Sequence, residues 1–241
     1  MVSRNRAGRM EQLARKARLR HIFEGQLIHC LALAVLMALV IFCVEMVGTQ
    51  SGQFLWLSSR QWIWLVLLNA IIHQFYVWFC WRFELHGGLL SRRFGESAFR
   101  LYAIGFTVLF IFRPILIFSL AWMDRGTWNV NSVFGCSAAT ICFIAAAYTM
   151  HSVRVHFSFS RAFGVDHFDE SYRKMPFVRK GAFRISPNAM YVFGFLTLWI
   201  PAFLFQSKAA LVMAVFSHAY IWVHYIATER PDMRHIYSDL P

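Results

Sequence analysis

The sequence predicts an all-α protein, a polytopic membrane bundle of about six transmembrane helices. Of its 241 residues, 58% are hydrophobic and only 15% are charged, whereas soluble domains carry about 25% charged residues. The apolar residues are also gathered into long blocks, which is typical of membrane spans rather than of a soluble core. The alternation of Lys and Arg between successive loops supports the same architecture.

Six blocks approach the length of about 20 residues that a helix needs to cross a bilayer. They are residues 27–48, 62–82, 101–122, 132–153, 189–205 and 209–227. The fifth block is short and contains Gly194 and Pro201, so we expect it to tilt, bend or end inside the protein. Five spans with a re-entrant hairpin are the alternative to six.

The basic residues predict the orientation of the chain. Most of the 24 Lys and Arg residues fall in the N-terminal tail, the second and fourth loops and the C-terminal tail. Because cytoplasmic loops are enriched in Lys and Arg, we expect both termini to be cytoplasmic, in a bacterial inner membrane or, in a eukaryote, the endoplasmic reticulum. The net charge of +12 is explained by this topology and by attraction to anionic lipid. No recognition motif accompanies the basic residues, so nucleic-acid binding is not expected.

Two regions are predicted along the chain. Residues 1–26 form a basic N-terminal segment, for which a surface helix and a frayed tail are both open interpretations. Residues 27–241 form one integral membrane domain. The five cysteines all fall in predicted spans and form no CxxC pair, so neither a disulfide framework nor a metal site is expected.

Polar side chains within the spans predict contacts between helices, because lipid offers no hydrogen-bond partner. In the second span Asn69, His73, Tyr76 and Cys80 fall on one helical stripe. Such a stripe is typical of an interface between helices, and a surface that faces the substrate is the alternative.

An arginine and a proline, Arg113 and Pro114, fall within the third span and are expected to interrupt it. An intramembrane arginine is costly unless it is paired or hydrated, which makes Arg113 a candidate functional residue. Two interpretations are open, an ion pair with Glu45 of the first span and a contact with a headgroup phosphate.

The C-terminal stretch 184–237 has the strongest functional signal, because polar groups flank its apolar segments on both sides. Two polar stripes run along the helix of the sixth span. One consists of His218, Trp222, Tyr225 and Glu229, and the other of Ser217, Tyr220, His224 and Thr228. Two adjacent stripes that end at a glutamate predict a polar cavity open to the cytoplasm. Residues 186–191 enter the fifth span from the same side, so the two motifs are expected to face each other across a C-terminal helical hairpin.

At these residues the chain resembles a family of membrane methyltransferases. The resemblance rests on two motifs. The first is Asn188-Ala189-Met190-Tyr191, before the fifth span, and the second is Glu229-Arg230-Pro231, followed by Ile236-Tyr237, after the sixth. The chain is similar here to the group that includes phosphatidylethanolamine N-methyltransferase and isoprenylcysteine carboxyl methyltransferase. The lipid N-methyltransferases of that group show Asn-Pro-Met-Tyr and Glu-Glu-Pro in this order and at this spacing.

The departures from the family pattern are informative. Ala189 replaces the family proline, Arg230 replaces the second glutamate, and the glycine expected two residues after the tyrosine stands one residue later, at Gly194. The carboxyl methyltransferases have Arg-His-Pro where this chain has Pro187-Asn188-Ala189. The lipid-amine branch therefore fits better than the prenylcysteine branch.

The resemblance implies S-adenosylmethionine as cofactor and a membrane phospholipid as substrate, with phosphatidylethanolamine methylated toward phosphatidylcholine. The implied cofactor residues are Asn188, Met190, Tyr191, Gly194, Glu229, Arg230 and Pro231. Glu229 is expected to hold the cationic or ribose end of the cofactor, and the backbone at Gly194 to allow a close approach.

The acceptor amine must lose a proton before it attacks, and histidine is the natural base because its pKa lies nearest working pH. The candidates are His218, His224, His151 and His167. The aromatic rings of Tyr220, Trp222 and Tyr225 could surround the growing quaternary ammonium, and Arg113, Arg154, Arg184 and Arg230 could hold lipid phosphate. Structural packing is the competing interpretation for each histidine and each ring.

Two other functions compete with phospholipid N-methylation. The enzyme could methylate another amphipathic acceptor, such as a prenylcysteine carboxylate or a thiol. A non-catalytic transporter or assembly protein is the alternative from a different class. A transporter is expected to show broken helices in both of two repeated halves, whereas here a broken element occurs only near the end of the chain.

Overall fold

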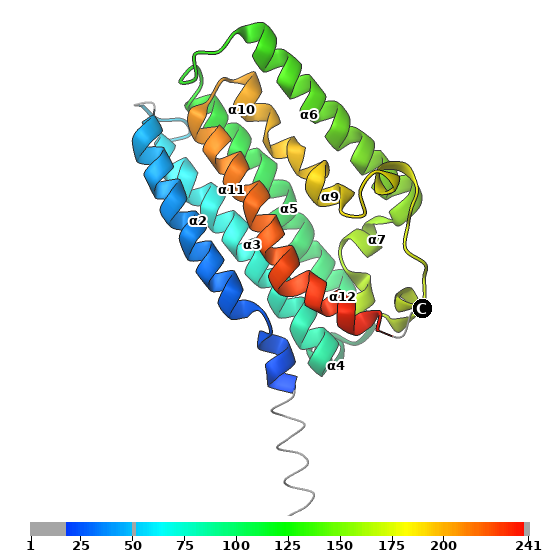
Figure 1. Cartoon of the computed structure of the whole chain (residues 1–241). Helices are drawn as coiled ribbons and strands as arrows, with labels where there is room; N and C mark the ends of the chain where they lie inside the picture. The colour runs from blue at the N-terminus through cyan, green and yellow to red at the C-terminus, as the bar shows by residue number, and fades with distance from the viewer. Residues whose placement is uncertain (1–17, 50–51, 239–241) are drawn as a thin grey trace, which may run out of the picture.

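The computed structural model describes residues 18–49 and 52–238, and within them it is a helical bundle (Figure 1). The N-terminal half contains α2 (Gln26–Val47), α3 (Ser59–Gly87), α4 (Leu89–Phe94), η1 (Gly95–Ser97), α5 (Ala98–Met123) and α6 (Ser132–Ser152). The connection that follows contains η2 (Val153–Phe157), α7 (Phe159–Ala162), η3 (Val165–His167), α8 (Glu170–Arg173) and η4 (Gly181–Arg184). The chain then forms α9 (Ala189–Val192), η5 (Gly194–Leu198), α10 (Ile200–Leu204), α11 (Lys208–His224), η6 (Tyr225–Glu229) and α12 (Arg230–Ile236). The predicted all-α class is confirmed.

Five helical stretches in the described residues are long and apolar enough to cross a membrane. They are Arg18–Val47, Ser59–Gly87, Leu89–Met123, Ser132–Phe157 and Lys208–Ile236. The sixth predicted span, residues 189–205, corresponds to the shorter apolar stretch Ala189–Leu204. This stretch is divided into α9, η5 and α10, as the glycine and the proline in it suggested.

The third span differs from its prediction, because α5 continues through Pro114 without interruption. Proline removes one backbone donor from a helix interior, but the flanking turns of α5 remain helical on both sides. Of the two open interpretations of Arg113, the ion pair with Glu45 is not formed: Glu45 pairs instead with the exposed Arg60, with its Oε1 3.1 Å from Nη2. Arg113 therefore lies in an unbroken helix without this partner.

Side chains cap the starts of three of the long helices, α3, α6 and α11. Ser58 and Gln61 form a reciprocal capping box at the start of α3, and the side chain of Asn131 caps α6. At the start of α11, Ser207 Oγ accepts a hydrogen bond from the Ala210 N–H at 3.0 Å. The buried carboxylate of Asp124 accepts from Ser207 Oγ at 2.8 Å, which ties the end of α5 to the start of α11.

The main core lies where α3, α5, α10 and α11 meet. Small residues on α11, among them Ala209, Ala210 and Ala214, are fully buried and allow neighbouring helices to approach closely. Ile117 and Leu120 of α5 complete this core. By contrast, α2 exposes most of its large apolar side chains, as expected of a helix that faces lipid.

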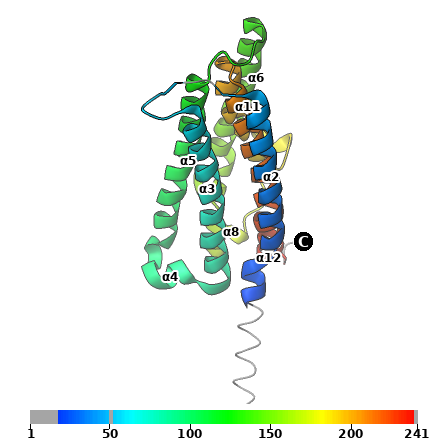
Figure 2. The ribbon, with the colours of Figure 1, turned by 90° about the vertical axis from the view of Figure 1, so that its left-hand side faces the viewer.

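Both described ends of the chain lie at the same end of the bundle. In Figures 1 and 2, the N-terminal end of α2, α4 and α12 are all found at the lower end. We call this the basic end, because the exposed Arg92 and Arg93 belong to α4 and the exposed Arg230 and Arg234 to α12. The basic end is the one that the charge distribution predicts to be cytoplasmic.

Part of the predicted basic segment 1–26 can be compared with the structure, whereas its first 17 residues lie outside the described residues. Residues 18–23 are helical, and a turn at residues 24 and 25 joins them to α2. This short helix contacts α3: Trp78 Nε1 donates to the Ile22 carbonyl at 3.0 Å, and Ile22 is buried.

A glycine substitution tests this packing. Gly25 has φ +78°, and a Cβ there would lie 2.3 Å from the carbonyl oxygen of Ala227. Gly48 has φ +67° but nothing within 4 Å of an added Cβ. Gly48 has ψ 173°, a conformation that is essentially confined to glycine, so we expect Gly48→Ala to cost about 1–3 kcal/mol through backbone strain alone. We expect Gly25→Ala to cost more, because the clash with Ala227 adds to its backbone strain.

The measurement is thermal unfolding of both purified variants in detergent, with the wild-type chain as reference. Equal stability of the two variants would show that the contact between Gly25 and Ala227 does not contribute.

Candidate active site

The two sequence motifs meet in the structure. The Tyr191 hydroxyl, on α9, donates a hydrogen bond to Oε2 of Glu229, at the end of η6. The contact is possible because α9–α10 and α11 lie side by side (Figure 1), and Trp199 Nε1 donates to Nδ1 of His218 at 3.1 Å further along the same pair. Residues 38 positions apart in the sequence are thus brought into direct contact.

Asn188 lies directly beside this contact along the chain. Its carbonyl accepts hydrogen bonds from the N–H groups of Tyr191 at 2.9 Å and Val192 at 3.0 Å. Its side chain does not cap α9 and is half-buried. The amide of Asn188 and the phenol of Tyr191 therefore both belong to the start of α9, and the phenol binds the Glu229 carboxylate.

The fold itself does not require a glycine at position 194. A Cβ added to Gly194 would meet only Cγ2 of Thr149, at 3.7 Å, which is ordinary van der Waals contact. The backbone there has no positive φ. Space beside this backbone is therefore available to a group other than the protein.

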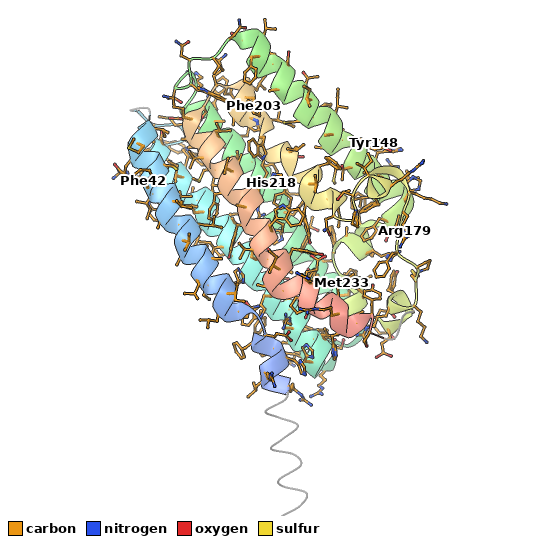
Figure 3. The ribbon with its side chains drawn as sticks, viewed as in Figure 1. Phe42, Tyr148, Arg179, Phe203, His218 and Met233 are labelled. Atoms are coloured by element: carbon orange, nitrogen blue, oxygen red, sulfur yellow. The ribbon has the colours of Figure 1, made fainter. Side chains whose placement is uncertain are left out.

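Aromatic rings surround the Tyr191–Glu229 contact. The ring centroids of Trp222 and Tyr225 lie 6.0 Å and 5.9 Å from that of Tyr191. The Phe195 ring lies 5.9 Å from His218, and Figure 3 shows His218 on the side of α11 that faces α9 and η5. The first predicted stripe of the sixth span thus faces the broken segment 189–204.

The second predicted stripe faces a different part of the protein. The Tyr220 hydroxyl lies 2.9 Å from Nε2 of His29 on α2, and Gln26 Nε2 donates to Thr228 Oγ1 at 3.2 Å. The sequence predicted that the two stripes line one shared cavity. In the structure they do not, because helices pack on both flanks of α11. Tyr220, predicted as a substrate residue, lies in the interior beside α2.

A change in helix geometry places Glu229. Residues Tyr225–Glu229 form a π-helix between α11 and α12. Such segments are uncommon and occur often at functional sites. The extra residue in this turn changes the register of α12 relative to α11, so that Glu229 points to Tyr191 while Asp232 points into the protein.

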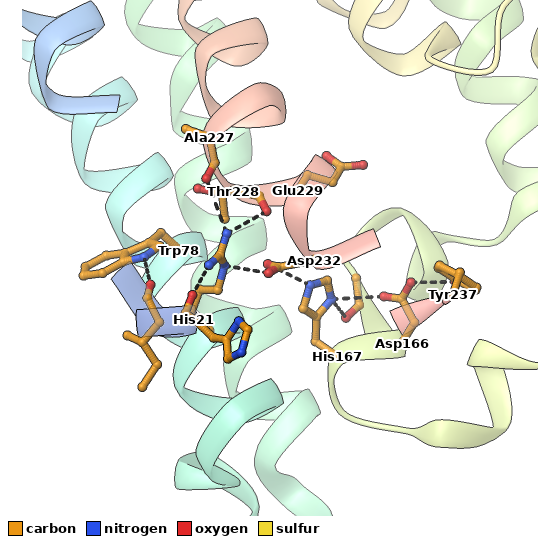
Figure 4. A network of polar contacts seen from close by, with 12 residues as sticks. His21, Trp78, Asp166, His167, Ala227, Thr228, Glu229, Asp232 and Tyr237 are labelled. Atoms are coloured by element: carbon orange, nitrogen blue, oxygen red, sulfur yellow. Dashed lines mark hydrogen bonds and ion pairs between the residues drawn. The ribbon is translucent and has the colours of Figure 1, made fainter. Parts of the chain in front are cut away.

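A buried polar network holds α12 in place, and Figure 4 shows its members. Arg82 Nε lies 2.6 Å from Oδ1 of Asp232, and both side chains are only 1% exposed. The other carboxylate oxygen of Asp232 is 3.3 Å from Nε2 of His167. His167 Nδ1 is 3.1 Å from Asp166, whose other oxygen accepts from the Tyr237 hydroxyl at 2.8 Å.

Arg82 also binds backbone carbonyls of two other segments. Its guanidinium donates to the carbonyl of His21 and to those of Ala227 and Thr228, at 3.3 Å and 3.1 Å. One side chain of α3 therefore joins the N-terminal helix, the π-helix and α12. Arg82 is the last residue of the second predicted span, 62–82, and the structure buries its side chain inside the protein.

Charge on His167 is stabilised by its neighbours. Burial disfavours the charged ring, but hydrogen bonds and the charges of Asp166 and Asp232 outweigh burial and raise the pKa of His167 to about 9. The Trp81 ring stacks on it, with centroids 4.2 Å apart, which favours a cation. For Asp166, burial is outweighed by His167 and Tyr237, so that its pKa is lowered.

The four candidate histidines are dispersed. His218 contacts the segment that carries Tyr191. His224 is 2% exposed and lies near His29, with ring centroids 6.3 Å apart. His167 has both ring nitrogens bound to carboxylates, and His151 is exposed at the end of α6.

The remaining predicted residues separate into surface and interior groups. Arg154, Arg184 and Arg230 are exposed, whereas Arg113 is 4% exposed within the bundle. Pro231 occupies the first turn of α12, where a missing N–H costs nothing. Met190 packs against the cluster of Val153, Ala182, Phe183 and Ala189.

Comparison with known proteins supports the motif assignment. The model of the phospholipid methyltransferase family matches residues 132–239. The C-terminal part of the chain matches this family. The matched region begins with α6 and contains both motifs, and it supports a membrane methyltransferase. Searches of curated proteins and of solved structures gave no match.

The pH dependence of stability tests the network. The pKa of His167 is about 9 in the folded protein, against 6.5 for an unperturbed ring. The stabilisation is therefore complete below about pH 6.5 and is lost as the pH rises through about 9, with a total on the order of 3 kcal/mol. We expect the melting temperature of the wild-type chain to fall across this range and that of His167→Gln to fall much less. Identical pH profiles of the two proteins would contradict this account.

Proposed function

We propose that the protein transfers a methyl group from S-adenosylmethionine to the amine of a membrane phospholipid, with phosphatidylethanolamine methylated toward phosphatidylcholine. The observation that carries the proposal is the hydrogen bond between Tyr191 and Glu229. It joins the two motifs that resemble the lipid N-methyltransferases, and both lie within the region matched by the family model.

The chemistry of the residues present fits the cofactor. A carboxylate suits ribose hydroxyls or an ammonium group, an amide and a phenol supply further hydrogen bonds, and aromatic faces attract a sulfonium cation. Glu229, Asn188 and Tyr191 provide these polar groups, and Trp222 and Tyr225 provide the faces. The room beside Gly194 allows a ligand to approach the backbone.

The cofactor supplies a methyl group that is already activated on sulfur, so the protein's task is to position the reactants and exclude water. The rings of Phe195, Trp222 and Tyr225 pack against the Tyr191 ring and make its surroundings apolar. Arg154, Arg184 and Arg230 are exposed, and their guanidinium groups suit lipid phosphates.

His218 is the histidine we assign to the acceptor's proton, because it is the one of the four that contacts the segment bearing Tyr191. Its Nδ1 accepts a hydrogen bond from Trp199 Nε1, and an indole N–H can only donate. The neutral ring therefore carries its proton on Nε2, and it can accept a second proton at Nδ1 only when the bond to Trp199 is released.

Substitution of the glutamate tests the function directly. Purified wild-type chain is expected to transfer labelled methyl from S-adenosylmethionine to vesicles of phosphatidylethanolamine. Glu229→Gln keeps the side-chain shape but removes the charge, so we expect affinity for S-adenosylhomocysteine to fall at least tenfold. The exposed Glu96 provides a matched control, and Glu96→Gln is expected to bind as the wild type does.

The outcomes separate the alternatives. Cofactor binding without labelled lipid would favour another amphipathic acceptor, and no cofactor binding at all would favour a non-catalytic membrane protein. An unchanged dissociation constant for Glu229→Gln would remove this residue from the site.

A second substitution tests whether the cofactor lies against the backbone at Gly194. Because an added Cβ at Gly194 meets only Thr149 in the protein, Gly194→Ala is expected to leave the melting temperature unchanged or slightly raised. If the cofactor occupies that space, affinity for S-adenosylhomocysteine falls at least fivefold. Calorimetric titration and thermal unfolding of the same sample measure both; lowered stability with unchanged affinity would contradict the assignment.

A further inference from the structure

Eight described side chains have buried polar atoms without a hydrogen-bond partner. Of these, Arg82 is ion-paired with Asp232, and Trp81 and Tyr102 belong to a separate apolar cluster with Val77 and Cys80. The other five lack partners at Oδ1 of Asn69, both ring nitrogens of His73, Nε of Arg113, Oγ of Ser217 and Nδ1 of His224. Each of these side chains is at least nine-tenths buried. Native proteins leave few buried polar atoms unsatisfied, because each costs about 1–3 kcal/mol.

The five residues come from three helices that pack together. Arg113 of α5 donates from Nη2 to the Ala70 carbonyl of α3, in a long bond of 3.4 Å. His73 lies one turn along α3 and is close enough to Arg113 and His224 to interact with both electrostatically. Asn69 lies one turn before His73, and its amide donates to the Leu109 carbonyl of α5.

Arg113 carries a buried charge that the described residues do not balance. Its guanidinium is not within 4.0 Å of any described carboxylate. It lies over the Phe195 ring, with the centroid 5.7 Å away, and near the Tyr220 phenol. Glu45, the partner expected from the sequence, is paired with Arg60. An unpaired arginine inside a membrane protein is costly, which indicates that an anion from outside the chain completes the site.

We propose that Arg113, His73, Asn69, Ser217 and His224 form an internal binding site for a zwitterion, with the anionic group on Arg113. Guanidinium binds phosphate and carboxylate through paired N–H groups. The amide oxygen of Asn69 accepts only, and a neutral imidazole offers one acceptor as well as one donor. The ligand therefore carries a donor such as an ammonium close to its anion.

Two molecules of the proposed reaction have this chemistry, and to that extent the inference rests on the proposed function. The methionine end of the cofactor carries a carboxylate beside an ammonium, and the phosphatidylethanolamine headgroup carries a phosphate beside an ammonium. The Phe195 ring contacts both Arg113 and His218, so the zwitterion site adjoins the candidate active site.

Binding and activity of the full-length chain in detergent distinguish the two sources. Arg113→Met removes the charge, Ser217→Ala removes one unpartnered hydroxyl, and Arg60→Met is the control because Arg60 is exposed. The probes are S-adenosylhomocysteine, which has the amino-acid end, 5′-methylthioadenosine, which lacks it, and phosphatidylethanolamine vesicles. Native mass spectrometry counts phospholipids that remain bound.

A site for the cofactor carboxylate predicts that Arg113→Met weakens binding of S-adenosylhomocysteine at least tenfold and leaves 5′-methylthioadenosine unchanged. A site for the headgroup predicts that binding of both nucleosides is unchanged. The lipid concentration for half-maximal methyl transfer then rises at least tenfold, and bound phospholipid is lost. Ser217→Ala is expected to weaken binding of S-adenosylhomocysteine, or to raise the lipid concentration for half-maximal transfer, by threefold or more. If Arg113→Met does not fold, this variant alone distinguishes the two ligands.

The inference is overturned if both variants bind all probes as the wild type does and melt at the same or a higher temperature, since removal of unpaired polar groups stabilises an empty interior. If the wild-type chain binds neither nucleoside, the proposed function fails, and the mass spectrum alone decides the site. Phospholipid that is retained by the wild type and lost from Arg113→Met then supports a zwitterion site, and equal retention overturns it.

Discussion

The buried ion pair between Arg82 and Asp232 is the interaction on which the C-terminal arrangement depends. Both charges are almost completely excluded from solvent, and loss of one partner from such a pair costs about 3–5 kcal/mol because the other charge is left uncompensated. The same arginine binds the carbonyls that the π-helix presents. It therefore fixes the start of α12, and with it the direction in which Glu229 leaves the helix toward Tyr191.

The polar groups of this protein are divided between the two flanks of α11. One flank faces the broken segment 189–204, where rings and hydrogen bonds surround the Tyr191–Glu229 contact. The other faces α2, α3 and α5, where Arg113 and His73 lie without sufficient partners. Phe195 contacts both groups. A ligand that carries a nucleoside or a lipid at one end and a zwitterion at the other therefore finds suitable chemical groups on both flanks of α11.

The sequence predicted the helices well, because membrane spans follow from length and hydrophobicity alone. It also predicted the interruption of residues 189–205 from Gly194 and Pro201, and the meeting of Tyr191 with Glu229 from motif order. It did not predict the pairing of Arg82 with Asp232, because the two residues are far apart in the chain and each resembled an ordinary charge at a helix end. His167 was predicted as a candidate base and not as a member of this network. The separation of the two α11 stripes depended on which helices pack on each flank, and helical periodicity does not contain that information.

The central claim is that Asn188, Tyr191 and Glu229 jointly bind an adenosyl cofactor. The most direct measurement is an experimental structure of the full-length chain with S-adenosylhomocysteine bound. The account predicts density for the nucleoside in contact with the Glu229 carboxylate and the start of α9, with the Arg82–Asp232 pair intact. A nucleoside bound elsewhere, with Tyr191 and Glu229 still joined only to each other, would contradict it.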